Sequence, residues 1–416
     1  MIDKKHINDY LHFGYIPKFG QVAKIRSVLS PQFYYDREDM ETKSEVELIQ
    51  MGIDALNFVF DDLLENNTNV EKNHLVPLSG GLDSRLILAA LLERVEAKKI
   101  HCVTFGSPKS FDFDIPEKIV KNTGVNLERI DCTQLDYSKE KLVKAVENGG
   151  KWTSIPDIYI NQLSLKFGED FNRWSGFLGG ELAGSYGDLN SKFDDNIAAF
   201  VKYQQKSTKL KLTELNYNPL LSLNEPDDLA QFNITEFEKL FLFNRSASGS
   251  LPIMFPEKLI VQTPFLHPRW VDFILKIPYK YRKKSKLFED ILLSMFPDFM
   301  ELPSKNKAGL GLGEHSTFRY YKNMAVLKVR FELNKYVQNV KFPPIGVNYI
   351  DYKNGIKQID SLNLVIKTAC ENLEDQKITP WLQPTEIFKK HMDNKEDYSK
   401  ALLLLLGLDI NLNTNK

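Results

Sequence analysis

The sequence predicts an α/β fold in which a parallel sheet with helices on both faces is followed by a mostly helical second half. Short apolar runs alternate with stretches of helical periodicity between about residues 75 and 178. This alternation is typical of a parallel sheet that is covered on both sides. Beyond about residue 191 only the helical periodicity continues. A length of 416 residues suggests two to three domains, at a prior of roughly 150 residues each.

We divide the chain into three parts. Residues 1–44 mix aromatic residues, Gly and Pro and are expected to pack as an arm or linker. Residues 45–191 are expected to form the α/β domain, and residues 192–416 the mostly helical region that completes it. Since no Gly/Ser-rich linker separates the halves, we expect them to share one interface.

The individual elements follow from periodicity and from turn residues. Residues 45–64 have apolar side chains at helical spacing and predict a helix. Strands are expected at residues 75–78, 99–105, 125–131 and 173–178, and helices at residues 84–94, 115–123, 138–147 and 157–168. Pro77 cannot donate to a ladder, so it should lie at a strand end or on an edge strand.

Composition and charge exclude several classes of protein. The contents of hydrophobic (43%), aromatic (12%) and charged (26%) residues are those of a soluble folded protein. The 54 basic and 55 acidic residues nearly cancel, so no overall field indicates a membrane or nucleic-acid partner. The basic stretch at residues 276–286 is interpreted as a solvated helix end.

The cysteines and the apolar runs point to the cytoplasm. Cys102, Cys132 and Cys370 form no pair or cluster of zinc-binding spacing. The N-terminus has no apolar core of a secretory signal, and the longest apolar run, residues 401–408, is too short to span a bilayer and predicts a buried helix. Cys102 is expected to be a core thiol, and His391 a helix-packing residue.

A Gly-rich turn joins the first predicted strand to the helix after it. Its residues are Ser79, Gly80, Gly81, Leu82, Asp83 and Ser84. Unpaired backbone N–H groups at such a helix start, together with the helix dipole, form an anion site. The glycines allow close approach of a ligand, and the hydroxyls add donors. A tight turn with Asp and Ser as helix caps is the simpler alternative, but all six residues together favour a phosphate or pyrophosphate site.

Asp83 would repel a bare phosphate, and this conflict is resolved if Asp83 holds Mg²⁺. The turn is not a Walker A loop, because no Gly-Lys-[Ser/Thr] follows at the required spacing. A loop without that lysine suits a site that holds the β- and γ-phosphates as leaving pyrophosphate, with attack at the α-phosphate.

The turn resembles the pyrophosphate loop of the N-type ATP pyrophosphatases, the PP-loop superfamily. Further segments narrow the resemblance to the synthetase domain of the asparagine synthetase family, and they cover nearly the whole chain. They are "YLHFGYIP" from Tyr10, "FD" at 111–112, "TPFLHPRWVDFILKIP" from Thr263, "ELPSKNKAGLGLG" from Glu301 and "IFKKHMDNKEDYSKALLLLLGLDI" from Ile387. The resemblance implies an adenine nucleotide alpha hydrolase-like fold, with ATP and Mg²⁺ as cofactors.

The resemblance also assigns roles to residues. Ser79 to Ser84 would bind the ATP phosphates, and Asp83 would carry Mg²⁺. Contacts with the nucleotide would come from Val103, Thr104 and Phe105 and from Ser175 and Gly176. Lys307 would neutralise charge at the α-phosphate and pyrophosphate in the transition state, with Lys305 as its competitor. The reaction implied is adenylation of a carboxylate, followed by displacement of AMP by ammonia or an amine.

Three departures from the family pattern stand out. Phe177 and Gly180 fall where an acid and a metal-binding Asp are expected, so either Glu181 or Asp188 would supply the second metal carboxylate. We take Glu181 as the metal-binding and catalytic candidate. His267 replaces the Asp of Pro-Phe-Leu-Asp, and we expect it to pair with Arg269 or Arg245.

The third departure is that Met1 is followed by Ile2, without the nucleophilic Cys and glutaminase domain of glutamine-dependent members. Ammonia would therefore come from solution or from a separate glutaminase, or a substrate amine would attack. The acid is expected to be a small molecule, a peptide or a sugar carboxylate.

Two other functions remain open. The loop could adenylate a nucleobase oxygen, as in RNA-modifying relatives, although no catalytic Cys pair or RNA-binding module is visible. The altered acidic segment could also mark a non-catalytic nucleotide-binding subunit that partners another enzyme.

Overall fold

Among the described residues, the sheet has five parallel strands in the order β3-β2-β1-β4-β5. They are β1 (Asn73–Pro77), β2 (Ile100–Gly106), β3 (Asn126–Asp131), β4 (Phe171–Trp174) and β5 (Val261–Gln262). The computed structural model describes residues 3–66, 71–168, 170–186, 195–255, 260–313, 317–336 and 350–414. In the register of the central strands, Leu75 lies opposite His101 on one side and Arg173 on the other. The predicted α/β class is confirmed.

The strand ends differ from the prediction at two places. β4 ends at Trp174, because Phe177 and Leu178 belong to a tight turn in which Leu178 has a left-handed backbone (φ 64°). The short β5 was not predicted, since two residues carry no periodic signal. Pro77 is the last residue of β1, at a strand end as expected, although β1 is the central strand.

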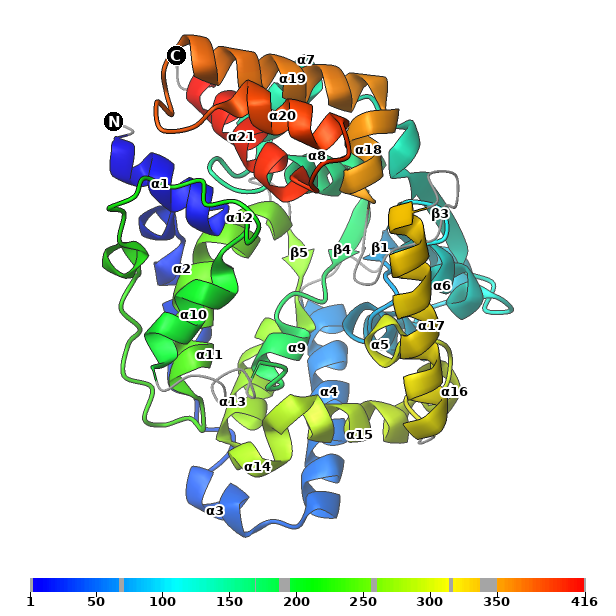
Figure 1. Cartoon of the computed structure of the whole chain (residues 1–416). Coiled ribbons are helices and arrows are strands. Elements are labelled where there is room, and N and C mark those ends of the chain that lie inside the picture. Colours follow the sequence, from blue (N-terminus) through cyan, green and yellow to red (C-terminus); the bar gives the residue numbers. More distant parts are fainter. Residues whose placement is uncertain are drawn as a thin grey trace.

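Helices cover both faces of the sheet (Figure 1). On one face the core includes Val76 and Cys102 and side chains from α4 (Glu45–Asn66), α5 (Asp83–Leu92), α6 (Phe111–Val120), α13 (Pro268–Lys276) and α15 (Lys286–Met295). On the other it includes Leu75 and Val103 and side chains from α7 (Lys139–Asn148), α8 (Ile155–Gln162), α19 (Asp360–Asp375) and α21 (Ser399–Asn413). Neighbouring strand residues thus feed opposite cores, as the strand period of two requires.

The N-terminal segment packs firmly on the rest of the molecule. It contains α1 (Lys4–Phe13), α2 (Val22–Val28) and α3 (Arg37–Thr42). Tyr10, Phe13 and Tyr15 are fully buried, and α1 lies beside α21, the last helix of the chain (Figure 1). The aromatic side chains of this segment are therefore part of the core.

The second half is mostly helical, as predicted. Its other helices are α10 (Asn196–Gln204), α11 (Glu236–Leu240), the π-helix η7 (Phe241–Ser250), α12 (Leu251–Met254), α14 (Tyr279–Arg282), α16 (Pro297–Met300), α17 (Thr317–Tyr336), α18 (Tyr352–Gln358) and α20 (Pro384–Met392). Short 3-10 turns occur at Pro17–Phe19, Ala97–Lys99, Cys132–Gln134, Leu163–Phe167, Pro219–Ser222, Pro264–Leu266, Lys283–Ser285 and Lys305–Lys307. Within the described ranges, no helix is long and apolar enough to cross a membrane.

Individual side chains test several predictions. Residues 401–408 lie in the largely buried α21, Cys102 is a buried thiol, and His391 is buried between helices. The interpretation of residues 276–286 as a solvated helix end is wrong at two positions. Lys276 is buried in an ion pair with Asp272 (2.7 Å), and Arg282 is buried as well, so these charges are structural.

Candidate functional site: the carboxyl edge of the sheet

The strand order places a switch point between β1 and β4. From β1 the chain continues to β2 and β3 on one side, and it later returns to β4 and β5 on the other. Ligands of open parallel sheets bind outside the carboxyl ends of the strands at such a point, because the loops there diverge. The loops concerned are residues 79–84 after β1 and residues 175–181 after β4.

The turn after β1 is held by its own side chains. The Ser79 N–H donates to Ser84 Oγ (3.0 Å), and the Gly81 N–H donates to Ser79 Oγ (3.1 Å). The Gly80 N–H donates to Asp112 Oδ1 at the start of α6 (2.9 Å). A Cβ at Gly80 would lie 3.0 Å from the Phe111 carbonyl oxygen. The turn is therefore compact, and its amide and hydroxyl groups gather at the start of α5.

The turn after β4 packs directly on Asp83. A Cβ on Gly176 would lie 2.8 Å from the Asp83 Cβ, and one on Gly179 would lie 2.6 Å from the Asp83 carboxyl group. At Gly180 the added Cβ would meet nothing closer than 3.8 Å. Glycine at 176 and 179 thus permits the contact between the two loops.

The surroundings of the Asp83 and Glu181 carboxyl groups disfavour the charged form of each. Burial, and then the negative charge of Glu181, raise the pKa of Asp83 to about 7, although the Gly180 N–H and the charge of Lys305 act in the opposite direction. Burial also raises the pKa of Glu181. A cation between these groups would relieve both effects.

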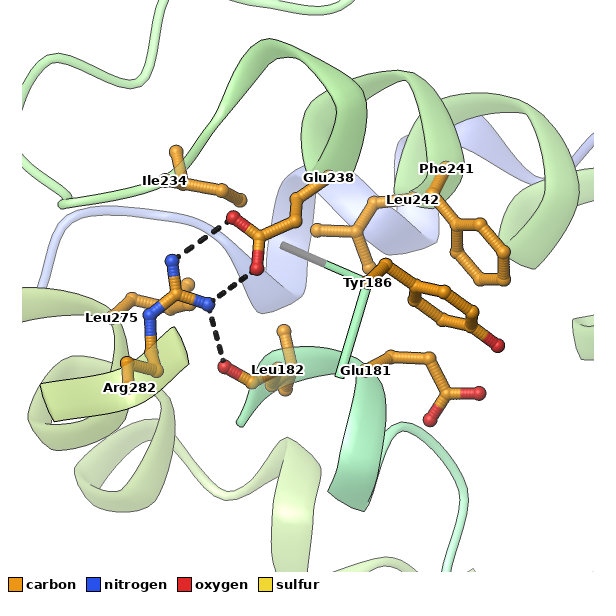
Figure 2. A pocket seen from close by; sticks show the side chains of 9 residues that line it. All are labelled: Glu181, Leu182, Tyr186, Ile234, Glu238, Phe241, Leu242, Leu275 and Arg282. Atoms are coloured by element: carbon orange, nitrogen blue, oxygen red, sulfur yellow. Dashed lines mark hydrogen bonds and ion pairs between the residues drawn. The ribbon is translucent and has the colours of Figure 1, made fainter. Parts of the chain in front are cut away.

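A buried ion pair holds the turn that carries Glu181. The Arg282 guanidinium donates to both carboxylate oxygens of Glu238 (2.7 and 3.0 Å) and to the carbonyl oxygen of Leu182 (3.0 Å), in α9 (Gly179–Leu182). Figure 2 shows that the Glu181 carboxylate and the Tyr186 hydroxyl point away from this pair. Sequence analysis missed this role of Arg282, because the residue lies in a strongly basic stretch.

Of the two candidate lysines, Lys305 lies against the Gly-rich turn. Its N–H donates to the Gly80 carbonyl oxygen (3.0 Å), and its Nζ donates to both oxygens of Asp112 (2.9 and 3.1 Å). The Lys307 Nζ is instead paired with Glu289 of α15 (2.7 Å).

Arg85, on the first turn of α5, positions the segment that precedes these lysines. Its buried guanidinium donates to the carbonyl oxygens of Phe299, Leu302 and Pro303. Burial lowers the pKa of Arg85 to about 10. The helix that begins at the Gly-rich turn is thereby joined to the lysine loop. No sequence signal identified this residue, because its partners are backbone atoms more than two hundred residues away.

The remaining predicted nucleotide contacts lie at the carboxyl ends of β2 and β4. Val103, Thr104 and Phe105 are buried, and Thr104 Oγ1 donates to the Asp112 carbonyl oxygen (2.5 Å). The Ser175 N–H donates to the Gln262 carbonyl oxygen (2.9 Å), and Ser175 Oγ accepts from the Phe177 N–H (3.2 Å). These residues therefore border the turn, and their contacts with a nucleotide stay a prediction.

The altered positions have distinct surroundings. Phe177 is buried and packs on Phe255, in surroundings unsuited to a carboxylate. The expected pairing of His267 with the side chain of Arg269 or Arg245 is wrong. Its Nε2 lies 3.2 Å from Asp62 Oδ2 instead, and its Nδ1 accepts from the backbone N–H of Arg269 at the start of α13 (3.2 Å). It replaces an Asp as a helix cap. Asp188 lies outside the described residues.

A divalent cation fits this site only with help from a ligand. In the described part of the chain, no group of three or more His, Cys, Asp or Glu side chains could hold a metal ion. Mg²⁺, however, commonly binds through one or two carboxylates together with phosphate oxygens. Asp83 and Glu181 match that requirement if a nucleotide supplies the remaining oxygen ligands.

The part of the chain that contains the Gly-rich turn matches a known protein family. Residues 60–163 match the model of the asparagine synthase family. This segment is thus similar to the asparagine synthase family. The match supports a relation between the turn after β1 and a family of ATP-dependent, amidotransferase-like synthetases. A search of curated proteins found no match.

The match to the asparagine synthase family does not include all of the candidate site. It includes β1, β2, β3 and the turn with Asp83, but it ends before β4, Glu181 and the lysine loop. The segments outside it include the one in which Phe177 and Gly180 replace expected acids.

Proposed function

We propose that this protein is an ATP-dependent, AMP-forming ligase that joins a carboxylic acid to ammonia or to an amine. The observation that carries the proposal is the contact between two loops at the switch point. There the Gly-rich turn after β1 presents Asp83 to the turn that bears Glu181. One loop supplies donors for phosphate, and the two acids suit Mg²⁺.

In the proposed reaction, an oxygen of the substrate carboxylate attacks the α-phosphorus of ATP. The bond from that phosphorus to the bridging oxygen breaks, and pyrophosphate leaves from the Gly-rich turn. The nucleophilic nitrogen then attacks the acyl carbon, loses a proton and displaces AMP. The protein's contribution is to hold the two reactants together and to stabilise charge on the leaving group.

We assign the cation at the leaving pyrophosphate to Lys305 rather than to Lys307. Only Lys305 bonds to the Gly-rich turn, and Asp112 orients its ammonium group. We expect Lys305→Met to lower the rate of ATP/pyrophosphate exchange by about a hundredfold or more, as for removal of one charge-stabilising donor. Lys307→Met, which removes the same charge two positions away, serves as the matched comparison. A larger loss in Lys307→Met would return the role to Lys307.

The proposed function is tested by a screen for carboxylate-dependent exchange of labelled pyrophosphate into ATP. Exchange reports the acyl adenylate before the nucleophile is known. We expect exchange with at least one class of acid, and its loss in Asp83→Ala, whereas Asp61→Ala, at an exposed site on α4, should retain it. Formation of ADP would contradict the proposal. Binding of ATP without exchange for any acid would favour the non-catalytic nucleotide-binding subunit instead.

A further inference from the structure

The Asp112 carboxylate occupies two donors that the proposed reaction needs for phosphate. Its Oδ1 accepts hydrogen bonds from the Gly80 N–H (2.9 Å) and from Lys305 Nζ (2.9 Å), and its Oδ2 accepts from Lys305 Nζ (3.1 Å). The first donor belongs to the Gly-rich turn, and the second is the cation assigned to the leaving pyrophosphate. An anion of the protein itself therefore takes up part of the anion site.

The fold holds Asp112 firmly in this place. The residue lies in the first turn of α6, and its side chain is almost completely buried, with 4% exposed. Its carbonyl oxygen accepts from Thr104 Oγ1 near the end of β2 (2.5 Å). The start of α6 also lies close against the turn, since a Cβ on Gly80 would be 3.0 Å from the Phe111 carbonyl oxygen. The carboxylate is thus a fixed part of the site.

Lys305 is held less completely than its partner. Its backbone N–H donates to the Gly80 carbonyl oxygen (3.0 Å), which fixes the start of the side chain at the turn. The side chain is 25% exposed, and its Nζ lies 4.0 Å from the position of a Cβ on Gly81. Because lysine has a flexible four-carbon stem, the ammonium group can exchange one anion for another without movement of the backbone.

A phosphate group at the Gly-rich turn must compete with Asp112 for both donors. Hydrogen bonds between charged partners are among the strongest in proteins, so giving up the bonds of Asp112 costs part of the binding free energy of the ligand. The two anions also repel each other when both are present. This competition weakens the binding of pyrophosphate, and weak binding of a product favours its release, a step that limits the turnover of many enzymes.

We propose that Asp112 is an internal competitor of pyrophosphate. It holds Lys305 and the Gly80 N–H in the ligand-free protein, yields them when the phosphates of ATP bind, and takes them back as pyrophosphate leaves. The inference rests on the proposed function and adds to it a residue that sets the affinity for the leaving group. Asp112 acts through Lys305 and the turn, so it is a positioning residue.

The test measures the binding of magnesium pyrophosphate by isothermal titration calorimetry, without ATP or acid. Asp112→Asn removes the competing charge, and we expect it to bind pyrophosphate about tenfold more tightly or better than the unaltered protein, since Lys305 no longer has to leave a charged partner. Loss of a residue that only supports the turn would weaken binding instead. Equal or weaker binding by Asp112→Asn, or no binding by either protein, overturns the inference.

Two single variants keep this outcome interpretable. Asp114→Asn removes the same charge two positions away, at a side chain that is 45% exposed and paired with Arg129 (3.1 Å), and it should leave pyrophosphate binding unchanged. If the thermal unfolding midpoint of Asp112→Asn shows a folding defect, Asp112→Ser removes the charge with a smaller side chain and must show the same tighter binding.

A double variant tests the part played by Lys305. The gain in affinity from Asp112→Asn should be smaller when Lys305→Met is also present, because the two side chains are coupled. An equal gain in both backgrounds would overturn the role given to Lys305. Exchange of pyrophosphate into ATP without the tighter binding would count against this inference alone, and tighter binding without exchange for any acid would count against the proposed function alone.

Discussion

Asp83, the proposed metal ligand, lies in an environment that disfavours its charged form. Burial and the neighbouring Glu181 raise its pKa to about 7, against 3.8 for an ordinary Asp. Between these values the folded protein holds a proton that the unfolded chain has released. The resulting stability is complete below the unfolded pKa and is lost as the pH rises through about 7.

Asp83→Asn should therefore stabilise the protein and inactivate it. The amide cannot ionise, so the variant should unfold at a higher temperature than the unaltered protein at about pH 8, with a smaller difference at about pH 5. Mg²⁺-dependent ATP binding should be lost. Thermal unfolding across this pH range measures the first effect, and Asp375→Asn, at an exposed position, is the control. A difference that does not grow with pH would contradict the role of the raised pKa.

Adjacent glycines after β4 should respond differently to the same change. Gly179→Ala places a methyl group 2.6 Å from the Asp83 carboxyl group, and we expect a loss of about 1–3 kcal/mol in the free energy of unfolding. It should also weaken ATP binding, because Asp83 must move. Gly180→Ala meets nothing closer than 3.8 Å and should be nearly neutral. Urea denaturation of the two variants decides the point, and equal stabilities would contradict the packing described.

At the scale of elements, the Arg282–Glu238 pair fixes α9 against α11 and α14. Both side chains are almost completely buried, with exposures of 1% and 3%. Arg282→Met should lower the free energy of unfolding by about 3–5 kcal/mol, because it leaves the Glu238 charge buried without its partner.

The double variant Arg282→Met/Glu238→Leu removes both charges and should recover much of that loss. Equal stability of Arg282→Met and the double variant would contradict this structural role of the ion pair. Arg282→Met should also bind Mg²⁺-ATP more weakly, since the Arg282 guanidinium holds the Leu182 carbonyl next to Glu181.

Prediction from sequence succeeded for elements whose signals are local. The helix at residues 45–64 and the strands β1, β2 and β3 have clear periodicity, and the Gly-rich turn is contained within consecutive residues. It failed where tertiary packing decides: for the two-residue β5, for the end of β4 and for Arg85, whose partners come from a distant loop. The charged residues at 276 and 282 have an ordinary basic pattern, and only the fold shows that they are buried.

For the whole molecule, the helical second half is part of the site rather than an appendage. It supplies Lys305 to the Gly-rich turn and Arg282 to the Glu181 turn. An α/β domain cut at about residue 191 would therefore lack Lys305 and Arg282.

In the proposed reaction, the switch-point loops direct a carboxylate to the α-phosphorus of ATP. The most direct test uses an acid that supports exchange, labelled with ¹⁸O in its carboxylate, and mass spectrometry of the nucleotide formed when a nucleophile is present. We expect AMP that contains one ¹⁸O atom derived from the acid, with unlabelled pyrophosphate. Label in inorganic phosphate with formation of ADP, or AMP without label, would contradict it.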